Sequence, residues 1–151
     1  NGIFTGDTFG LAYPTLTTEK GPFIMPTTTP VQFDPEALKQ SINTLMALQP
    51  TTMYLTHYGP VGDVQALGQQ LLAQVDDYVA IAEKAGARAP AEALDQQRLE
   101  QQLIESLTEY TFARARAHGC AQSSTELEHI LAMDMKLNGQ GLAVWLTSSA
   151  G

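Results

Sequence analysis

Two residues of metal-binding type follow short apolar runs in this sequence. Asp7 follows the run at residues 2–5, and His57 follows the run at residues 52–56. Each is next to a glycine-containing loop, a pattern typical of strand ends, so a rigid sheet could direct both side chains at one point. A carboxylate oxygen and an imidazole nitrogen suit zinc, iron or manganese, and a carboxylate can bridge two such ions. Because even a catalytic zinc ion takes about three protein ligands, this pair predicts half of a metal site.

The segments around these residues resemble a known superfamily. Residues 4–10 (Phe-Thr-Gly-Asp-Thr-Phe-Gly) resemble the segment that carries the bridging aspartate of metallo-β-lactamase-fold hydrolases. Residues 56–59 (Thr-His-Tyr-Gly) are similar to the strand end that carries the last metal-binding histidine of that family. The proline- and threonine-rich residues 22–35 resemble the active-site loop of a bacterial branch. The similarity runs from residue 2 to about residue 62, and more loosely beyond.

The resemblance implies that the intact protein is a binuclear metallo-hydrolase. Asp7 would be catalytic by bridging two divalent metal ions, most simply zinc, with iron or manganese as alternatives, and His57 would complete the coordination of one ion. A metal-bound hydroxide would attack an acyl substrate, with a thioester expected first and a lactone or other ester second. A helical tail recurs in relatives with such activity, the hydroxyacylglutathione hydrolases. Tyr58 could hydrogen-bond the substrate carbonyl, and a packing role is its alternative.

The sequence departs from the family pattern in one respect. The His-x-His-x-Asp-His motif of the family, and the histidine after it, lie upstream of the bridging aspartate, and this sequence contains no His-x-His. We therefore expect the C-terminal part of a longer protein, inactive alone, whose partner is the missing N-terminal half of the same protein.

Two other classes of function stay open. One is a mononuclear iron enzyme of the same fold, such as a persulfide dioxygenase. The other is a helical dimerisation or interaction module, in which the amphipathic helices of residues 63–151 bury their apolar stripes against a partner.

Composition excludes several classes of partner. The formal net charge of -8, with only 8 lysines and arginines, disfavours nucleic acid, which requires clustered basic residues. No run approaches the roughly 20 apolar residues of a membrane helix. The single cysteine, Cys120, excludes an intrachain disulfide and favours the cytoplasm.

The two other histidines are assigned structural positions. We assign His118 to a helix end, where the helix dipole favours a cation, and His129 to a helix surface.

Local signals predict four or five helices after a long loop. Residues 9–33 contain four prolines and no helical periodicity, so we expect an ordered loop with a brief strand at residues 23–25. One helix should begin with Asp34 as its cap, a second should run from Asp63 to near Gly86, and a third from Pro90 to Gly119. Ser123 and Glu126 form a capping box for the fourth. Residues 138–141 (Asn-Gly-Gln-Gly) predict an interruption of regular structure. Residues 142–146 could form a strand or a short helix, and the resemblance favours a helix.

These elements indicate an α+β protein in two parts. Residues 1–62 would form the second half of an αββα metallo-β-lactamase sandwich, with few short strands plus a helix, and residues 63–151 an α-helical C-terminal region. Two or three short strands cannot bury both of their faces. We therefore expect the sheet to be covered by the missing half or to pair with a second copy in a homodimer, unless the helical part carries the stability.

Overall fold

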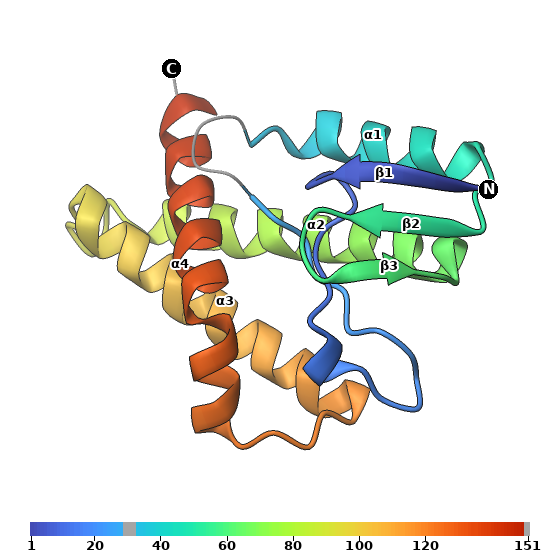
Figure 1. The fold of residues 1–151 in the computed structure, drawn as a ribbon. Helices are drawn as coiled ribbons and strands as arrows, with labels where there is room; N and C mark the ends of the chain where they lie inside the picture. Colours follow the sequence, from blue (N-terminus) through green and yellow to red (C-terminus); the bar gives the residue numbers. More distant parts are fainter. Residues whose placement is uncertain (29–32, 150–151) are drawn as a thin grey trace.

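The described part of the chain has an α+β architecture in which one small sheet and four helices are packed together (Figure 1). The computed structural model describes residues 1–28 and 33–149. Residues 29–32, the last part of the predicted loop, lie outside this description. The elements, in chain order, are β1 (Gly2–Gly6), the 3-10 turn η1 (Pro14–Leu16), α1 (Pro35–Ala47), β2 (Thr52–Leu55), β3 (Gly59–Val61), α2 (Val64–Arg88), α3 (Gln96–His118) and α4 (Ser124–Ser149).

The sheet has the order β1-β2-β3, with β1 parallel to β2 and β2 antiparallel to β3. The two predicted strands are confirmed, whereas β3, which begins just after Tyr58, was not expected. Because β1 and β2 are parallel, their carboxyl ends lie at the same edge of the sheet. This places the loops that begin at Asp7 and at Thr56 next to each other.

One face of the sheet is covered by α1 and α2 (Figure 1). Met53 and Leu55 of β2 and Val61 of β3 are buried in a cluster with apolar side chains of α1 and of the first half of α2. The two helices pack closely, since a Cβ at Gly68 would lie 2.0 Å from the sulfur of Met46. Local chemistry sets the start of α1 as predicted. Its cap, Asp34, accepts a hydrogen bond from Ala37 N at 3.0 Å, and Pro35 follows at the first helical position.

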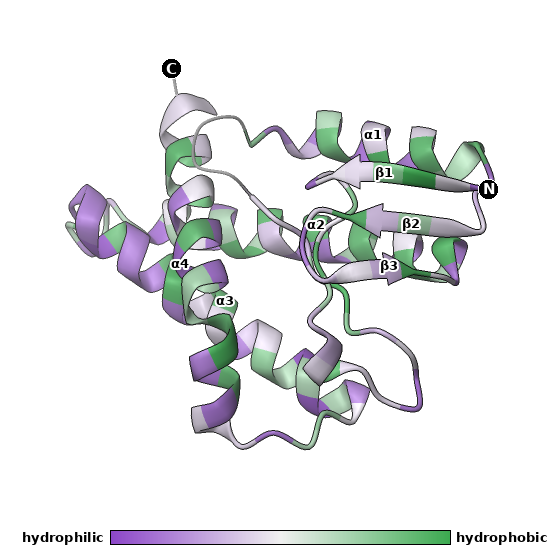
Figure 2. Ribbon diagram, viewed as in Figure 1, coloured by the Kyte–Doolittle hydropathy of each residue, from purple (hydrophilic) through white to green (hydrophobic). Residues whose placement is uncertain are grey.

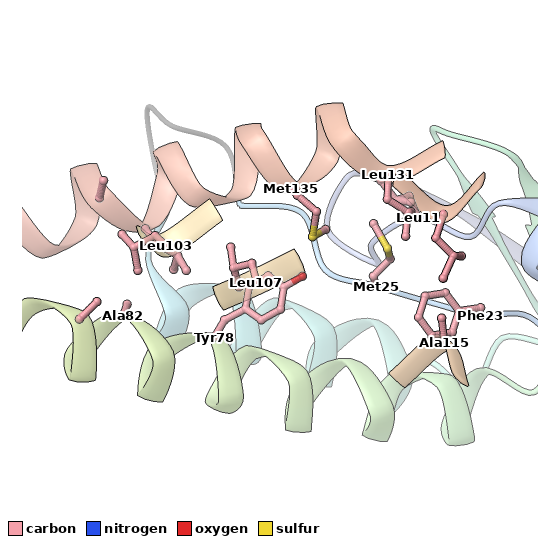
Figure 3. Close-up of a cluster of buried hydrophobic side chains, with 14 of the residues drawn as sticks. Leu11, Phe23, Met25, Tyr78, Ala82, Leu103, Leu107, Ala115, Leu131 and Met135 are labelled. Carbon is pink, nitrogen blue, oxygen red and sulfur yellow. The ribbon is translucent and has the colours of Figure 1, made fainter. Parts of the chain in front are cut away.

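A second apolar cluster lies among α2, α3, α4 and the loop that follows β1 (Figure 3). Its fully buried members include Tyr78 from α2, Leu103 and Leu107 from α3, and Leu131 from α4. Hydrophobic and hydrophilic positions alternate along α4, as expected for a helix with one buried face (Figure 2). Because α2 contributes to both clusters, it joins the sheet to the helical part.

Several predicted boundaries hold and others are wrong. The capping box of α4 is present, with Ser123 N donating to Glu126 Oε2 at 2.7 Å and Glu126 N to Ser123 Oγ at 3.2 Å. The third helix begins at Gln96 rather than Pro90, because Asp95 caps it by accepting from Arg98 N. Asp63 precedes α2 but forms no side-chain cap bond, and its φ is 45°.

The expected interruption at residues 138–141 is absent from the described chain, because α4 runs unbroken to Ser149. Residues 142–146 are therefore helical, as the resemblance favoured. The glycines serve close packing here: a Cβ at Gly139 would lie 2.5 Å from Ile104, and one at Gly141 would lie 2.4 Å from Thr28 O. The predicted brief strand at 23–25 is reduced to a single bridge between Leu11 and Met25.

No helix within residues 1–28 and 33–149 combines the length and apolar character that crossing a membrane requires.

Candidate metal and substrate site

Asp7 and His57 meet at the edge where β1 and β2 end. His57 Nε2 lies 3.6 Å from Asp7 Oδ1, and both side chains are about half exposed. The two residues are 50 positions apart in the sequence, so the parallel pairing of β1 and β2 is what brings them together. The structure thus places the predicted pair at one point.

The separation of these atoms is compatible with binding one ion. Two ligand atoms that each lie about 2.1 Å from a tetrahedral zinc ion would be roughly 3.4 Å apart. The pair therefore fits a zinc-like ion with a small adjustment. Within the part of the chain that the structure describes, no group of three or more histidine, cysteine, aspartate or glutamate residues is arranged to hold a metal.

Tyr58 is held beside His57 by an aromatic stack. Its φ of 75° lies in the left-handed region, which non-glycine residues seldom occupy. Its ring stacks on that of Tyr13 with centroids 4.2 Å apart, and the Tyr13 hydroxyl donates to Asp134 Oδ2 at 2.6 Å. A chain of contacts therefore runs from α4 through two tyrosines to the turn that carries His57.

A pocket of about 130 Å³ opens beside the pair. Its lining comes from the loops after β1 and β2, from the loop before α1, and from α4. The lining residues are Asp7, Leu11, Thr27, Thr28, His57, Asp134, Leu137 and Asn138. The site thus lies where the sheet region meets the helical region.

Asp134 is the half-buried carboxylate of this pocket. Burial raises the pKa of its carboxyl above the ordinary value, against the opposing effects of the hydrogen bond from Tyr13 and of the positive charge available at His57. Burial also raises the pKa of the Tyr13 hydroxyl, and the bond to Asp134 raises it further. Tyr13 therefore stays a donor, and Asp134 is held in one orientation.

Asn138, one turn after Asp134, anchors the loop on the other side of the pocket. Its Oδ1 accepts from Thr28 N at 2.8 Å, its backbone carbonyl accepts from Thr28 Oγ1 at 2.9 Å, and its Nδ2 donates to Pro26 O at 3.2 Å. The neighbouring Thr27 Oγ1 donates to Asp7 O at 3.2 Å. Because the bonds of Asn138 are buried and internally satisfied, they fix the loop that borders Asp7.

The α4 residues of the pocket were not predicted from the sequence. Asp134 and Asn138 are four apart and so share one face of the helix. That spacing is visible in the sequence, but Tyr13 and Thr28, which they meet, lie 121 and 110 residues away.

The other residues considered as candidates lie outside this pocket. His118 ends α3 as expected, with Nε2 2.9 Å from Gly21 O, and His129 is exposed on α4. Cys120 is buried with its thiol directed at Leu16 O, and burial raises its pKa, so it is a packing residue and not an activated nucleophile. A larger hollow of about 530 Å³ between α2 and α3 is lined mainly by charged and amide side chains of mixed sign.

Comparisons with known protein families, with curated proteins and with solved structures gave no match to this chain.

Proposed function

We propose that this chain supplies one half of a metal-dependent hydrolase of the metallo-β-lactamase fold, acting on an acyl substrate. The observation that carries the proposal is the Asp7–His57 pair, at 3.6 Å, on the ends of two parallel strands and beside a pocket. A carboxylate and an imidazole so placed are a donor set for zinc or a similar ion. Chain segments around both residues resemble the corresponding segments of that superfamily.

The roles follow from the positions of the residues. Asp7 would bridge two ions and His57 would complete the coordination of one. Divalent ions, when bound, lower the pKa of coordinated water and so make a nucleophile available near neutral pH. Tyr58 would border the reacting carbonyl, and the pocket beside the pair would take the acyl end of the substrate. The thioester is the first substrate class we propose, and a lactone or other ester the second.

The open face of the sheet supports a further layer. Phe4, Tyr54 and Pro60 lie in register across β1, β2 and β3 and point away from α1 and α2. Phe4 is 85% exposed and stacks on Tyr54 with ring centroids 4.8 Å apart. An apolar row on a small sheet needs cover. We propose that the first half of an αββα sandwich packs there, that residues 1–62 form the second half, and that residues 63–151 form the helical region.

Metal content tests the proposal directly. The 151-residue chain should not retain two divalent ions after dialysis against a mild chelator, because two ligands leave an ion mostly solvated. In a longer protein that contains this chain, Asp7→Ala should lower turnover by far more than tenfold, and His57→Ala should remove one ion per protein with little change in the melting temperature of the metal-free form. His129→Ala, an exposed histidine on α4, is the matched control.

Three results would speak against the proposal. Unchanged metal stoichiometry in His57→Ala would remove His57 from the site. Turnover within about tenfold of the parent in Asp7→Ala, roughly 1.4 kcal/mol of barrier, would remove Asp7. A single iron per protein would point to the mononuclear oxygenase class instead.

A further inference from the structure

The pocket beside Asp7 and His57 has a wall that metal binding does not use. This wall belongs to α4 and consists of Asp134, Leu137 and Asn138. Asn138 is committed to the loop at residues 26–28 by its buried hydrogen bonds. Leu137 is a large apolar side chain that is 42% exposed. Asp134 and Leu137 are therefore the parts of the wall that can contact a ligand.

The Asp134 carboxylate is oriented before any ligand arrives. Its Oδ2 accepts from the Tyr13 hydroxyl at 2.6 Å, and the Tyr13 ring is itself held by its stack on Tyr58. Preorganisation of this kind reduces the ordering cost of binding. Because the carboxylate is partly removed from water, an ammonium or other strong donor would compensate it better than solvent does.

Apart from the imidazole of His57, the charged side chains of the described lining are all acidic. The described residues that line it include two carboxylates and no lysine or arginine. A carboxylate or phosphate at the far end of a ligand would be repelled by Asp134, and the nearby Leu11 and Leu137 offer only apolar contact. The volume of about 130 Å³ is well below that of pockets for drug-sized ligands, so the pocket suits a short group.

We propose that Asp134 is a specificity-determining residue, which selects short acyl groups that end in an ammonium over acyl groups that end in a methyl or a carboxylate. This inference rests on the proposed function, because it takes the pocket to hold the acyl end of the substrate. The hydrogen bond from Tyr13 sets the position of the selecting carboxylate, and Leu137 with Leu11 contacts the methylene groups between the ammonium and the reacting carbonyl.

Binding of small acyl amides to the 151-residue chain tests the selection without any turnover. The probes are 3-aminopropanamide, butanamide and malonamate, which differ at the far end in charge but little in length. Titration is followed by the NMR signals of the Leu11 and Leu137 methyl groups. We expect 3-aminopropanamide to bind at least about tenfold more tightly than butanamide, as a hydrogen bond to a charged group would give, and malonamate to bind most weakly.

Asp134→Asn keeps the side-chain size and an acceptor for Tyr13 but removes the charge. It should therefore make the affinities for 3-aminopropanamide and butanamide nearly equal. Asp77→Asn is the matched control, since Asp77 accepts the same kind of bond from the Tyr110 hydroxyl at 2.6 Å, outside this pocket. It should leave the preference unchanged. Equal affinities for the three probes, no binding of any of them, or a preference that survives in Asp134→Asn would each overturn the assignment of Asp134.

Hydrolysis of the matching N-acetylcysteamine thioesters by the metal-loaded longer protein separates this inference from the proposed function. Selective binding without hydrolysis of any thioester would contradict the proposed hydrolase activity and would keep Asp134 as a recognition residue. Hydrolysis of all three thioesters without selective binding would keep the hydrolase and remove Asp134.

Discussion

The sheet region and the helical region differ in how completely they are enclosed. In the helical region, α2, α3 and α4 bury a cluster of apolar side chains from several directions (Figure 3). In the sheet region, α1 and α2 cover one face, and the other face exposes Phe4 and Tyr54 (Figure 1). The candidate ligands Asp7 and His57 lie in the open region. The candidate site thus belongs to the less enclosed part of the molecule, and the helices hold the loops beside it.

Two sets of hydrogen bonds from α4 connect the regions. Asp134 fixes Tyr13, which stacks beside the turn of His57, and Asn138 fixes the loop next to Asp7. Substitutions in the helical core should therefore cost much stability, and substitutions at the connection should cost an intermediate amount. Substitutions on the open face should cost almost nothing in the chain alone.

The largest loss of stability should follow Leu103→Ala. Leu103 is fully buried in the helical cluster, and large-to-small changes at such sites cost about 2–5 kcal/mol. Urea unfolding followed by circular dichroism measures the change. Met133→Ala, at a 64% exposed position on α4, is the control and should stay within about 0.5 kcal/mol of the parent. Equal effects of the two substitutions would contradict the enclosed helical core.

Asn138→Ala should cost about 3 kcal/mol, because it leaves Thr28 N and Pro26 O as buried groups without partners, at about 1–3 kcal/mol each. Asn43→Ala, at an exposed position of α1, is the control and should be neutral or slightly stabilising. Hydrogen exchange at Thr28 N should accelerate in the first variant alone. Unchanged exchange there would mean that Asn138 does not hold this loop.

The same connection shows how far the sequence predicts the fold. Both strands of the site, the Asp34 cap of α1 and the capping box of α4 were predictable because each depends on residues close in the chain. Residues 138–141 misled the prediction, since Asn and Gly favour a break locally whereas close packing against Thr28 and Ile104 keeps the helix intact.

The candidate site divides in the same way. Asp7 and His57 were predictable from strand-end patterns and from the resemblance. Asp134 was not predictable, because its place in the candidate site depends on a hydrogen bond from Tyr13, which lies 121 residues away in the sequence. Chain topology, which no local pattern contains, decides which loop a helix face meets.

Gly141→Ala should cost about 1–3 kcal/mol, because the added methyl would lie 2.4 Å from the backbone oxygen of Thr28 and neither side can move freely. Gly86→Ala is the matched comparison within a helix. Its methyl would meet the flexible end of Leu146 at 3.3 Å, so the gain in helix propensity of up to about 1 kcal/mol should offset the contact. Thermal unfolding of both variants gives the sign of each change in stability. A neutral Gly141→Ala would refute the close approach of α4 to the loop.

Alkaline pH should weaken the helical region through Tyr78. Burial raises the pKa of Tyr78 to about 12 from an ordinary value of 10.0. A tyrosine whose pKa is raised by folding makes its full contribution to the free energy of unfolding below pH 10. This contribution is lost as the pH rises toward 12, because in this range the unfolded chain releases the tyrosine proton before the folded chain does. The slope from this residue approaches about 1.4 kcal/mol per pH unit in that window. Tyr78→Phe should reduce the slope in urea unfolding measured between pH 9 and 11.5, and Tyr54→Phe, on the open face, serves as the comparison. An unchanged slope in Tyr78→Phe would place the alkaline sensitivity elsewhere.

The smallest effect is expected at the open face of the sheet. Phe4→Ala should change the stability of the 151-residue chain by no more than about 0.5 kcal/mol, because the side chain is 85% exposed. Ile3→Ala is the control, since Ile3 is the neighbour in β1 that packs against the cluster under the sheet, and it should cost more.

In a longer protein whose other half covers this face, Phe4→Ala should instead cost about 3–5 kcal/mol, as for a buried phenylalanine. A clear loss in the chain alone, growing with protein concentration, would show that a second copy covers the face, since association stabilises only the folded form. A small loss in both proteins would leave the face uncovered and would remove the main structural support for the sandwich.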